Sequence, residues 1–210
     1  MPHVIEWSRA YAHRLTPDSA LTFKARSGPI ARRLAQECAA GELPFLTMGF
    51  RPKLEREMAP LVPRIKGYRH MLVLGIGGSA LGARAMQRAF APGQDGPGHS
   101  GPWLWIADNV CAERFEALLG NLVPAQTLVV CISKSGGTIE TVAQYFLVRD
   151  WLKDALGASW QEHMIVVTDE QKGYLRQEAN RHGLTALEVP DFLGGRYSAL
   201  SAVGLLPAAF

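Results

Sequence analysis

The chain has 210 residues, of which 48% are hydrophobic and 20% charged, a composition typical of an α/β domain that buries a sizeable core. Its longest apolar runs are shorter than the roughly 18 residues that a membrane span needs, so the sequence predicts a cytoplasmic protein with no membrane partner. The net charge of +3 comes from scattered Lys and Arg rather than from a basic block, which argues against a nucleic-acid partner.

The three cysteines are an odd number, and their positions match no metal-binding spacing. Cys38, Cys111 and Cys131 are therefore expected to be packing thiols rather than parts of a disulfide framework or a zinc site. No metal and no other cofactor is expected from this sequence.

The first part of the chain, residues 1–68, is predicted to be a helical segment without strands. Apolar residues recur at helical spacing within residues 27–42 and 53–68. Glycine and proline are expected to interrupt this pattern, because both residues disfavour the interior of a helix. The interruptions are Gly28, Pro29, Gly41, Pro44 and Pro52.

From His70 onward, short apolar runs alternate with amphipathic stretches. Strands buried on both faces have such continuous runs, and their alternation with helices is typical of a parallel sheet. The predicted strands are residues 71–76, 103–107, 127–132, 164–168 and 184–189. The predicted helices are residues 79–90, 111–120, 138–156 and 172–182. The expected fold is α/β, a five-stranded parallel sheet with helices on both faces, after the helical N-terminal segment.

Two loops follow predicted strands, where open parallel sheets bind ligands beyond the carboxyl ends of their strands. The first loop, Gly-Ile-Gly-Gly-Ser-Ala at residues 75–80, has glycines that permit a tight turn and close backbone approach. Ser79 follows Gly78 and is expected to be the N-cap of the next helix. Because a helix N-terminus presents free amides and a positive dipole end, this loop suits an anion.

The second loop, Ser133–Thr138, follows the apolar run of residues 127–132. It holds three hydroxyl groups and one ammonium around two adjacent glycines, at the start of a predicted helix. Hydroxyls and amides at a helix N-terminus suit a phosphate dianion, and the glycines let the backbone fold around it. The residues expected to contact a phosphate are Ser133, Lys134, Ser135, Gly136, Gly137 and Thr138.

Each loop also has a purely structural interpretation, since glycine turns and serine or threonine caps often serve only strand-to-helix geometry. Residues 75–80 also match the dinucleotide pattern G-x-G-x-x-A, with Asp108 placed as a ribose-binding acid after the next strand. A nucleotide-binding oxidoreductase domain is therefore an alternative. The second, hydroxyl-rich loop argues against that alternative, because a dinucleotide fold needs only one phosphate loop.

Three blocks of the sequence, VLGIGGSALG, CISKSGGTIET and GGRYSALSAVGLLPA, resemble the glucose-6-phosphate isomerase family, in particular the first of its two sugar-isomerase (SIS) domains. The resemblance implies a flavodoxin-like three-layer SIS domain at residues 69–210 that binds glucose-6-phosphate and fructose-6-phosphate. It also implies aldose-ketose isomerisation in glycolysis and gluconeogenesis, with a homodimeric parent protein.

The resemblance implies roles for single residues. Gly78, Ser79 and the run Ser133–Thr138 are expected to hold the phosphate, with Lys134 also at the catalytic centre. Arg196 matches the arginine of the family's Gly-Gly-Arg, which stabilises an enediolate, a task suited to a guanidinium because it is always charged. Glu140 matches a family acid but is expected to have a structural role in the first helical turn.

Isomerisation also needs groups that move a proton and open the sugar ring. The resemblance places the glutamate, histidine and lysine that do this in sequence beyond Phe210. The chain is therefore expected to be the N-terminal portion of a longer isomerase and inactive alone, with a free-standing SIS-domain sensor of sugar phosphates as an alternative. Surface or strand-edge positions are expected for the six histidines, His3, His13, His70, His99, His163 and His182.

Overall fold

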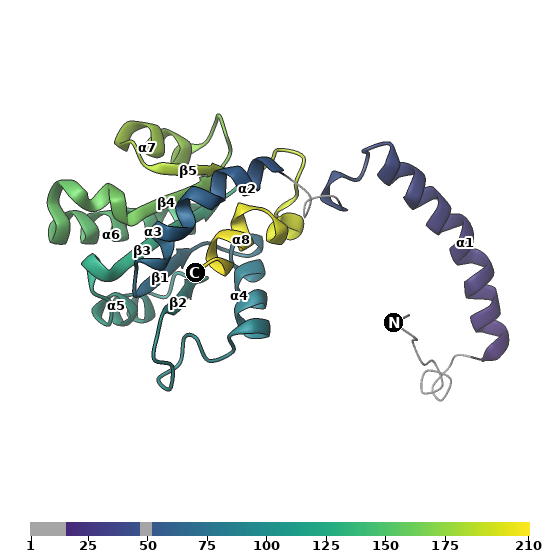
Figure 1. Ribbon diagram of the computed structural model, residues 1–210, viewed down its shortest axis with the longest axis horizontal. Helices are drawn as coiled ribbons and strands as arrows, with labels where there is room; N and C mark the ends of the chain where they lie inside the picture. Colours follow the sequence, from purple (N-terminus) through teal and green to yellow (C-terminus); the bar gives the residue numbers. More distant parts are fainter. Residues whose placement is uncertain (1–15, 47–51) are drawn as a thin grey trace. The chain divides into compact units, whose positions relative to one another are not determined.

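The computed structural model describes residues 16–46 and 52–210 of the chain. The chain divides into two compact units, residues 1–46 and 47–210, and every strand of the described residues belongs to the second unit (Figure 1). The predicted division into a helical segment of residues 1–68 and a sheet domain of residues 69–210 stays a prediction. Within the second unit, the short helices that precede the first strand pack apolar side chains into one of the two cores.

The first unit contains helix α1, Pro17–Ala39. A reciprocal capping box fixes its start: the Thr16 hydroxyl accepts from the Ser19 amide at 3.2 Å, and the Ser19 hydroxyl accepts from the Thr16 amide at 2.8 Å. Gly28 and Pro29, which the sequence predicts as interruptions, lie inside this helix. An interior proline removes one backbone hydrogen bond and crowds the preceding turn, at a cost of about 3 kcal/mol, yet α1 continues on both sides of Pro29.

The second unit alternates strands and helices. Its strands are β1 (His70–Leu74), β2 (Trp103–Ala107), β3 (Thr127–Ser133), β4 (Met164–Thr168) and β5 (Thr185–Glu188). Its α-helices are α2 (Pro52–Met58), α3 (Val62–Lys66), α4 (Gly78–Phe90), α5 (Ala112–Gly120), α6 (Ile139–Leu156), α7 (Tyr174–His182) and α8 (Ala202–Ala208). Its 3₁₀ turns are η3 (Ala59–Leu61), η4 (Pro124–Gln126), η5 (Gly157–His163) and η6 (Gly195–Leu200).

The five strands form one sheet in the order β2-β1-β3-β4-β5, and every neighbouring pair is parallel. The predicted five-stranded parallel sheet is thus confirmed. Strand β1 lies between β2 and β3, with Leu74 opposite Ala107 on one side and Cys131 on the other. Because β1 ends at Leu74, two residues that the sequence assigns to the strand, Gly75 and Ile76, belong to the following loop.

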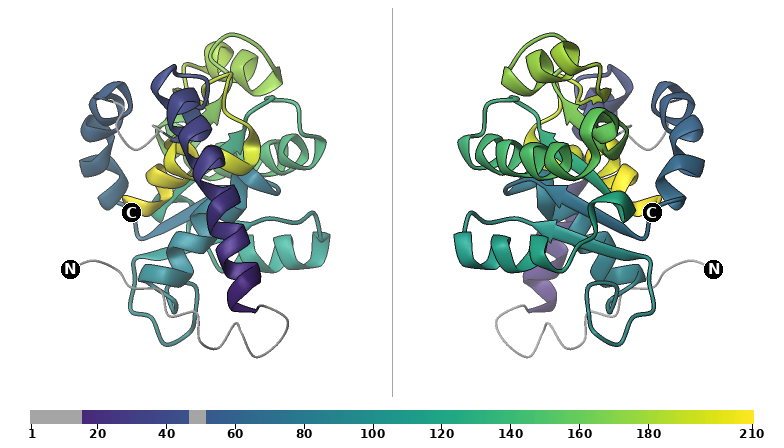
Figure 2. Two further views of the ribbon diagram at one scale, coloured as in Figure 1. Left: turned by 90° about the vertical axis from the view of Figure 1, so that its right-hand side faces the viewer. Right: turned by 90° about the vertical axis from the view of Figure 1, so that its left-hand side faces the viewer.

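Alternate residues of each strand face two separate apolar cores. Leu72 and Leu74 of β1 belong to a core that includes buried side chains of α5, α6 and α7. Met71 and Val73 belong to a second core, which includes Ile65 of α3 and apolar residues of α2 and α8. Because helices cover both faces of the sheet, strands β1, β3 and β4 are buried along their whole length and are mostly apolar rather than alternating (Figure 2). This confirms the predicted three-layer arrangement.

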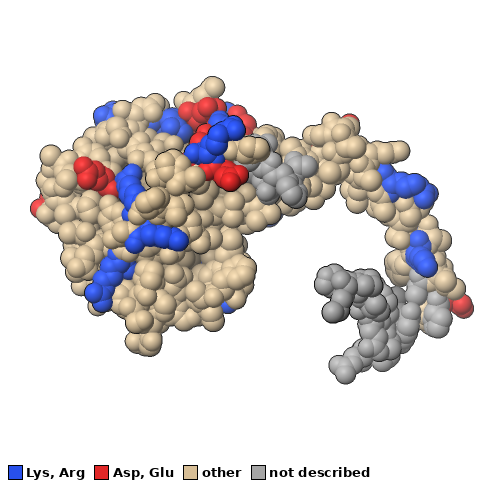
Figure 3. Space-filling model, in the orientation of Figure 1, with Lys and Arg blue, Asp and Glu red and all other residues tan. Residues whose placement is uncertain are grey.

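The surface of the second unit carries mixed charge. Figure 3 shows acidic and basic side chains side by side at the top of this unit. Lys53 of α2, for example, lies 2.8 Å from the Glu188 carboxylate at the end of β5. No helix in residues 16–46 and 52–210 combines the length and the apolarity that a membrane span requires.

Candidate functional site

The two predicted loops lie next to each other at the carboxyl ends of the strands. Strands β1 and β3 are parallel neighbours, so the loops Gly75–Ser79 and Ser133–Thr138 leave from the same side. The chain goes from β1 to β2 on one side of β1, whereas β3 lies on the other side. The order of strands therefore reverses between β1 and β3, which is where open α/β sheets bind their ligands.

The first loop makes a tighter turn than the sequence predicts. Gly77 has a φ of +56° and occupies the N-cap position, so α4 begins at Gly78. Ser79 therefore lies inside the first helical turn and is not the N-cap, which corrects the prediction. The reason is conformational, because a positive φ is open to glycine and strained for other residues. The half-buried Ser79 side chain is consequently not used as a helix cap.

Gly78 brings a third segment of chain to this loop. A Cβ on Gly78 would lie 2.4 Å from the Gly195 carbonyl oxygen and 3.2 Å from the Arg196 nitrogen. No side chain fits there, so the backbone of Gly195 and Arg196 packs directly on the start of α4. The three sequence blocks thus converge at one place, and the exposed Arg196 side chain starts from a backbone fixed against the first loop.

Three hydroxyl groups converge in the second loop. The oxygen of buried Ser133 lies 2.9 Å from that of Thr138, and the Ser135 oxygen lies 3.5 Å from each of them. Thr138 is the N-cap residue of α6, yet its hydroxyl makes no capping bond to the helix. The Thr138 side chain thus does not cap α6. The first amides of α6 stay available for an anion, at the positive end of an 18-residue helix.

The second loop is supported by the segment that follows β4. The Asp169 amide donates to the Lys134 carbonyl at 3.1 Å, and the Leu175 amide donates to the Gly136 carbonyl at 2.9 Å. A Cβ on Gly173 would lie 2.3 Å from the Ser135 carbonyl oxygen, so this close approach requires glycine. The hydroxyl cluster is thus held by backbone contacts from a neighbouring loop.

Asp169 shapes that supporting segment. Its carboxylate accepts hydrogen bonds from the amides of Gln171 at 2.9 Å and Lys172 at 3.0 Å. These two backbone donors stabilise the charged form and hold the pKa of the Asp169 carboxyl below its ordinary value. The sequence interpretation missed both Asp169 and Gly173. The available signal was an aspartate directly after an apolar run, followed by a glycine before a helix.

Lys134 is placed differently from the other loop residues. Its ammonium donates to the Asp191 carbonyl at 2.7 Å and so reaches toward the connection between β5 and η6. That connection leads directly to Gly195 and Arg196. An ammonium has three donors, so one bond to Asp191 leaves two for another acceptor. A contact between Lys134 and phosphate stays a prediction.

The remaining candidates lie outside this cluster. Asp108 accepts from the Arg84 guanidinium at 2.9 Å and 3.1 Å, so its carboxylate is engaged in an ion pair where a ribose would need it. Glu140 lies half-buried in the first turn of α6. The described histidines, His70, His99, His163 and His182, contact Trp105, Pro102, Thr127 and Glu178 respectively, while His3 and His13 lie outside the described residues.

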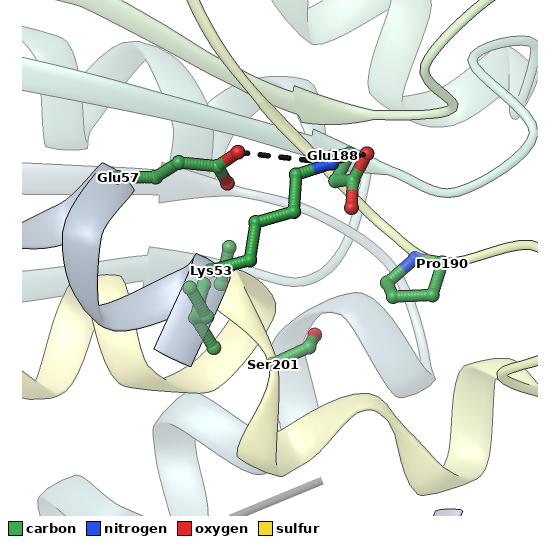
Figure 4. A pocket seen from close by; sticks show the side chains of 7 residues that line it. Lys53, Glu57, Glu188, Pro190 and Ser201 are labelled. Carbon is green, nitrogen blue, oxygen red and sulfur yellow. Dashed lines mark ion pairs between the residues drawn. The ribbon is translucent and has the colours of Figure 1, made fainter. Parts of the chain in front are cut away.

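A small cavity elsewhere in the unit is not a competing substrate site. Figure 4 shows Lys53 between Glu57 and Glu188, beside Pro190 and Ser201. Its volume is about 20 Å³, which is room for about one water molecule. It marks where α2 is joined to β5 and α8. In residues 16–46 and 52–210, no group of three or more His, Cys, Asp or Glu side chains forms a potential metal site.

The sequence is similar to known isomerases over most of its length. It is 46% identical over 139 residues to a glucose-6-phosphate isomerase of Thermus thermophilus, covering 66% of this chain and 32% of that protein. It is 36% identical over 184 residues to the enzyme of Carboxydothermus hydrogenoformans, covering 84% of this chain and 39% of that protein. The chain thus spans about a third of the length of these relatives.

Solved structures agree with this similarity. A hypothetical protein from Thermus thermophilus superposes with a TM-score of 0.78 at 37% identity, over 89% of this chain and 45% of that chain. A glucose-6-phosphate isomerase from Chlamydia trachomatis gives 0.61 at 30% identity, over 73% of this chain and 28% of that chain. The model of the phosphoglucose isomerase family matches residues 64–210, which include both loops and the Arg196 segment. The chain therefore belongs to the phosphoglucose isomerase family.

Proposed function

We propose that this chain is the phosphate-binding part of a glucose-6-phosphate isomerase, an enzyme that interconverts glucose-6-phosphate and fructose-6-phosphate through an enediolate. The observation that carries the proposal is the hydroxyl cluster of Ser133, Ser135 and Thr138, with its 2.9 Å contact, in front of the uncapped start of α6. Family membership supports the same reaction. Residues 69–210 would then be the SIS domain that binds the sugar phosphate.

The phosphate group suits this loop chemically. A dianion accepts several hydrogen bonds at once, and hydroxyl groups can rotate to donate to it. The three hydroxyls would exchange their mutual contacts for bonds to phosphate oxygens, while amides at the start of α6 donate as well. The Gly136 amide is already bonded to the Ser133 carbonyl at 3.1 Å, and the Gly137 amide would exchange its 3.3 Å bond to the Ser135 hydroxyl for a phosphate oxygen. Gly78 and Ser79 of the first loop would close the other side of the phosphate.

Arg196 is assigned to the reacting end of the sugar. Negative charge develops on the substrate oxygens as the enediolate forms, and a permanently charged guanidinium stabilises that charge without titrating. Because the Arg196 backbone packs against Gly78, the side chain extends from a fixed point next to the phosphate loop. A positioned donor of this kind typically contributes about a hundred- to a thousandfold in rate.

Proton transfer is a separate requirement, and a positioned general base contributes roughly a hundred- to ten-thousandfold. We assign it to the glutamate, histidine and lysine that the family resemblance places outside the stretch covered by this chain. Binding without turnover is therefore the expected behaviour of the 210 residues alone. The proposal includes a cytoplasmic location, a homodimeric parent protein, a role in glycolysis and gluconeogenesis, and no nucleic-acid or membrane partner.

The binding proposal is tested by NMR titration of the 210-residue chain with glucose-6-phosphate, using plain glucose as the control ligand. Glucose-6-phosphate should shift amide signals in both loops, with a dissociation constant on the order of millimolar, because an incomplete site offers few bonds. Ser135→Ala should weaken binding, whereas Ser100→Ala, which changes an exposed serine outside both loops, should not. Equal shifts with glucose would contradict a phosphate site.

The inactivity proposal needs its own assay. Protein is prepared from a host that lacks its own isomerase, and conversion of glucose-6-phosphate is compared with buffer and with Arg196→Ala. The expected result is no conversion above buffer for either protein. Turnover that Arg196→Ala abolishes would show that an acid within this chain transfers the proton, and Glu140 would be the first candidate.

A further inference from the structure

Strand β2 forms one edge of the sheet, with β1 as its one neighbour among the described strands. The Trp103 amide donates to Arg69 at 3.0 Å, and the Ala107 carbonyl accepts from Gly75 at 3.4 Å. In a parallel strand, alternate residues bond to the same neighbour. The backbone groups of Leu104 and Ile106 therefore face away from β1, along the free edge.

Two side chains of α4 occupy both outward carbonyls. Gln87 donates from Nε2 to the Leu104 carbonyl at 2.7 Å, and Arg84 donates from Nη2 to the Ile106 carbonyl at 2.9 Å. Residues 84 and 87 are three apart, so both lie on one face of the helix. These donors occupy the acceptors that the amides of a sixth strand would use.

Both side chains are themselves held in place. Gln87 is only 3% exposed, and its Oε1 has no hydrogen-bond partner in the part of the chain that the structure describes. Burial of the Gln87 amide oxygen without a partner costs free energy, and the hydrogen bond from the same side chain to Leu104 does not remove that cost. Arg84 is fixed by its ion pair with Asp108 at 2.9 Å. The arrangement is thus more specific than a chance surface contact.

Beside this edge lies an open groove of about 520 Å³. Its lining includes Arg84 of α4, Trp105 and Ile106 of β2, and Phe115 and Leu118 of α5. Space next to unpaired strand groups is the feature that lets edge strands pair with another chain. The groove has that space, but its two backbone acceptors are already bonded.

We propose that Arg84 and Gln87 act as an edge guard: they prevent the β2 edge from pairing with a strand of a second copy of this chain. An incoming strand would have to displace both side-chain donors and break the Arg84–Asp108 ion pair before it gained a bond to either carbonyl. The Leu104 and Ile106 amides also face this edge, but without the carbonyls they supply only half of the ladder bonds that pairing needs. This proposal is independent of the sugar-phosphate site.

The test replaces both residues with methionine, which is about as long as glutamine, is unbranched like arginine although shorter, and has no hydrogen-bond donor. Arg84→Met with Gln87→Met is compared with wild type and with Arg88→Met. Arg88 lies on the same helix and bonds Pro92 and Asp95 rather than the strand, so its replacement removes the same charge and leaves both carbonyls bonded. Self-association is measured by sedimentation over a range of protein concentrations, and circular dichroism checks folding.

The double variant should self-associate at least roughly tenfold more tightly than wild type, because two backbone acceptors become free. Hydrogen exchange of the Leu104 and Ile106 amides should slow with rising concentration in this variant and not in Arg88→Met. A folded double variant that associates no more than wild type would overturn the proposal, as would association without protection of these two amides. If the double variant does not fold, the same measurements are made on Arg84→Met alone. Tighter self-association than wild type is again the expected result, and no increase in self-association would overturn the proposal.

Discussion

The two loops at the switch point between β1 and β3 reach similar positions by different chemistry. The first loop depends on what its residues lack: Gly77 takes a positive φ, and Gly78 lets the Gly195 backbone approach where a Cβ would clash. The second loop depends on what its residues carry, three hydroxyls within 3.5 Å of one another. One loop is a packing surface, and the other is a set of donors.

This difference separates shape from chemistry within one site. A change at Gly78 should alter the position of a distant segment, including Arg196, whereas a change at a hydroxyl should remove a donor and leave the backbone in place. Stability and binding should therefore respond differently to substitutions in the two loops.

The largest effect is expected for Gly78→Ala. The new Cβ would lie 2.4 Å from the Gly195 oxygen, and because that neighbour is backbone rather than a flexible side chain, the segment must move. Overpacking of this kind costs about 1–3 kcal/mol, more than the usual gain of alanine over glycine in a helix. Urea denaturation should show a free energy of unfolding lower by about 2 kcal/mol.

The matched control for this prediction is Gly93→Ala, since a Cβ there meets no atom within 4 Å. Its free energy of unfolding should stay within about 0.5 kcal/mol of wild type. The amide signal of Arg196 should move in the Gly78 variant and stay in place in the control. Equal stability of both variants would show that the contact between Gly78 and Gly195 is looser than the structure indicates.

A smaller effect should distinguish two serines of the second loop. Ser133 is 1% exposed and bonds Thr138, so Ser133→Ala should lower the free energy of unfolding by about 1 kcal/mol. Ser135 is exposed, and Ser135→Ala should change the free energy of unfolding by less than about 0.5 kcal/mol. If both residues bind phosphate, both variants should weaken glucose-6-phosphate binding in an NMR titration. Stability loss at both positions would contradict the assignment of Ser135 as a solvent-facing donor.

The sequence predicts the sheet, and the position of the second loop after β3, because these signals are local. Apolar runs such as residues 164–168 coincide with strand β4, and the order of hydroxyls and glycines at Ser133–Thr138 is visible without coordinates. The contacts between loops are not visible in this way. Gly78 meets Gly195, and Gly173 meets Ser135, across long stretches of chain, so only the folded sheet brings them together. Pro29 is a local signal that predicts the end of a helix, but α1 continues through it. A helix can thus tolerate the one backbone hydrogen bond that a proline removes.

Acid should destabilise the second loop by weakening the Asp169 segment that is bonded to it. The folded pKa of Asp169 is depressed, so its contribution to stability is present above the unfolded pKa and is lost as pH falls through the folded value. Asp169→Asn keeps an oxygen acceptor for the two amides but does not titrate. Below about pH 4, the stability of wild type should therefore fall more steeply than that of Asp169→Asn, measured by urea denaturation.

The control for the acid effect is Asp154→Asn, which changes an exposed aspartate of α6 and should leave the acid slope like that of wild type. NMR signals of Lys134 and Gly136 should change during this acid titration before those of Gly77, because only the second loop is bonded to the Asp169 segment. Simultaneous changes in both loops would show that acid acts on all the loops at the carboxyl ends of the strands, rather than on the Asp169 segment alone.

The smallest effect on stability is expected for Lys134→Met. The ammonium bonds one backbone carbonyl, that of Asp191, from a partly exposed position, so its loss should change the free energy of unfolding by less than about 0.5 kcal/mol.

The connection that leads to Arg196 should nevertheless loosen. We expect faster hydrogen exchange at Leu193, whose amide bonds Pro190 at 3.0 Å within that connection, and weaker binding of glucose-6-phosphate. Lys134→Arg, which keeps a donor, should restore slow exchange. Weaker binding with unchanged exchange would place Lys134 on the phosphate alone, whereas faster exchange with unchanged binding would make it a tether between the second loop and the Arg196 segment.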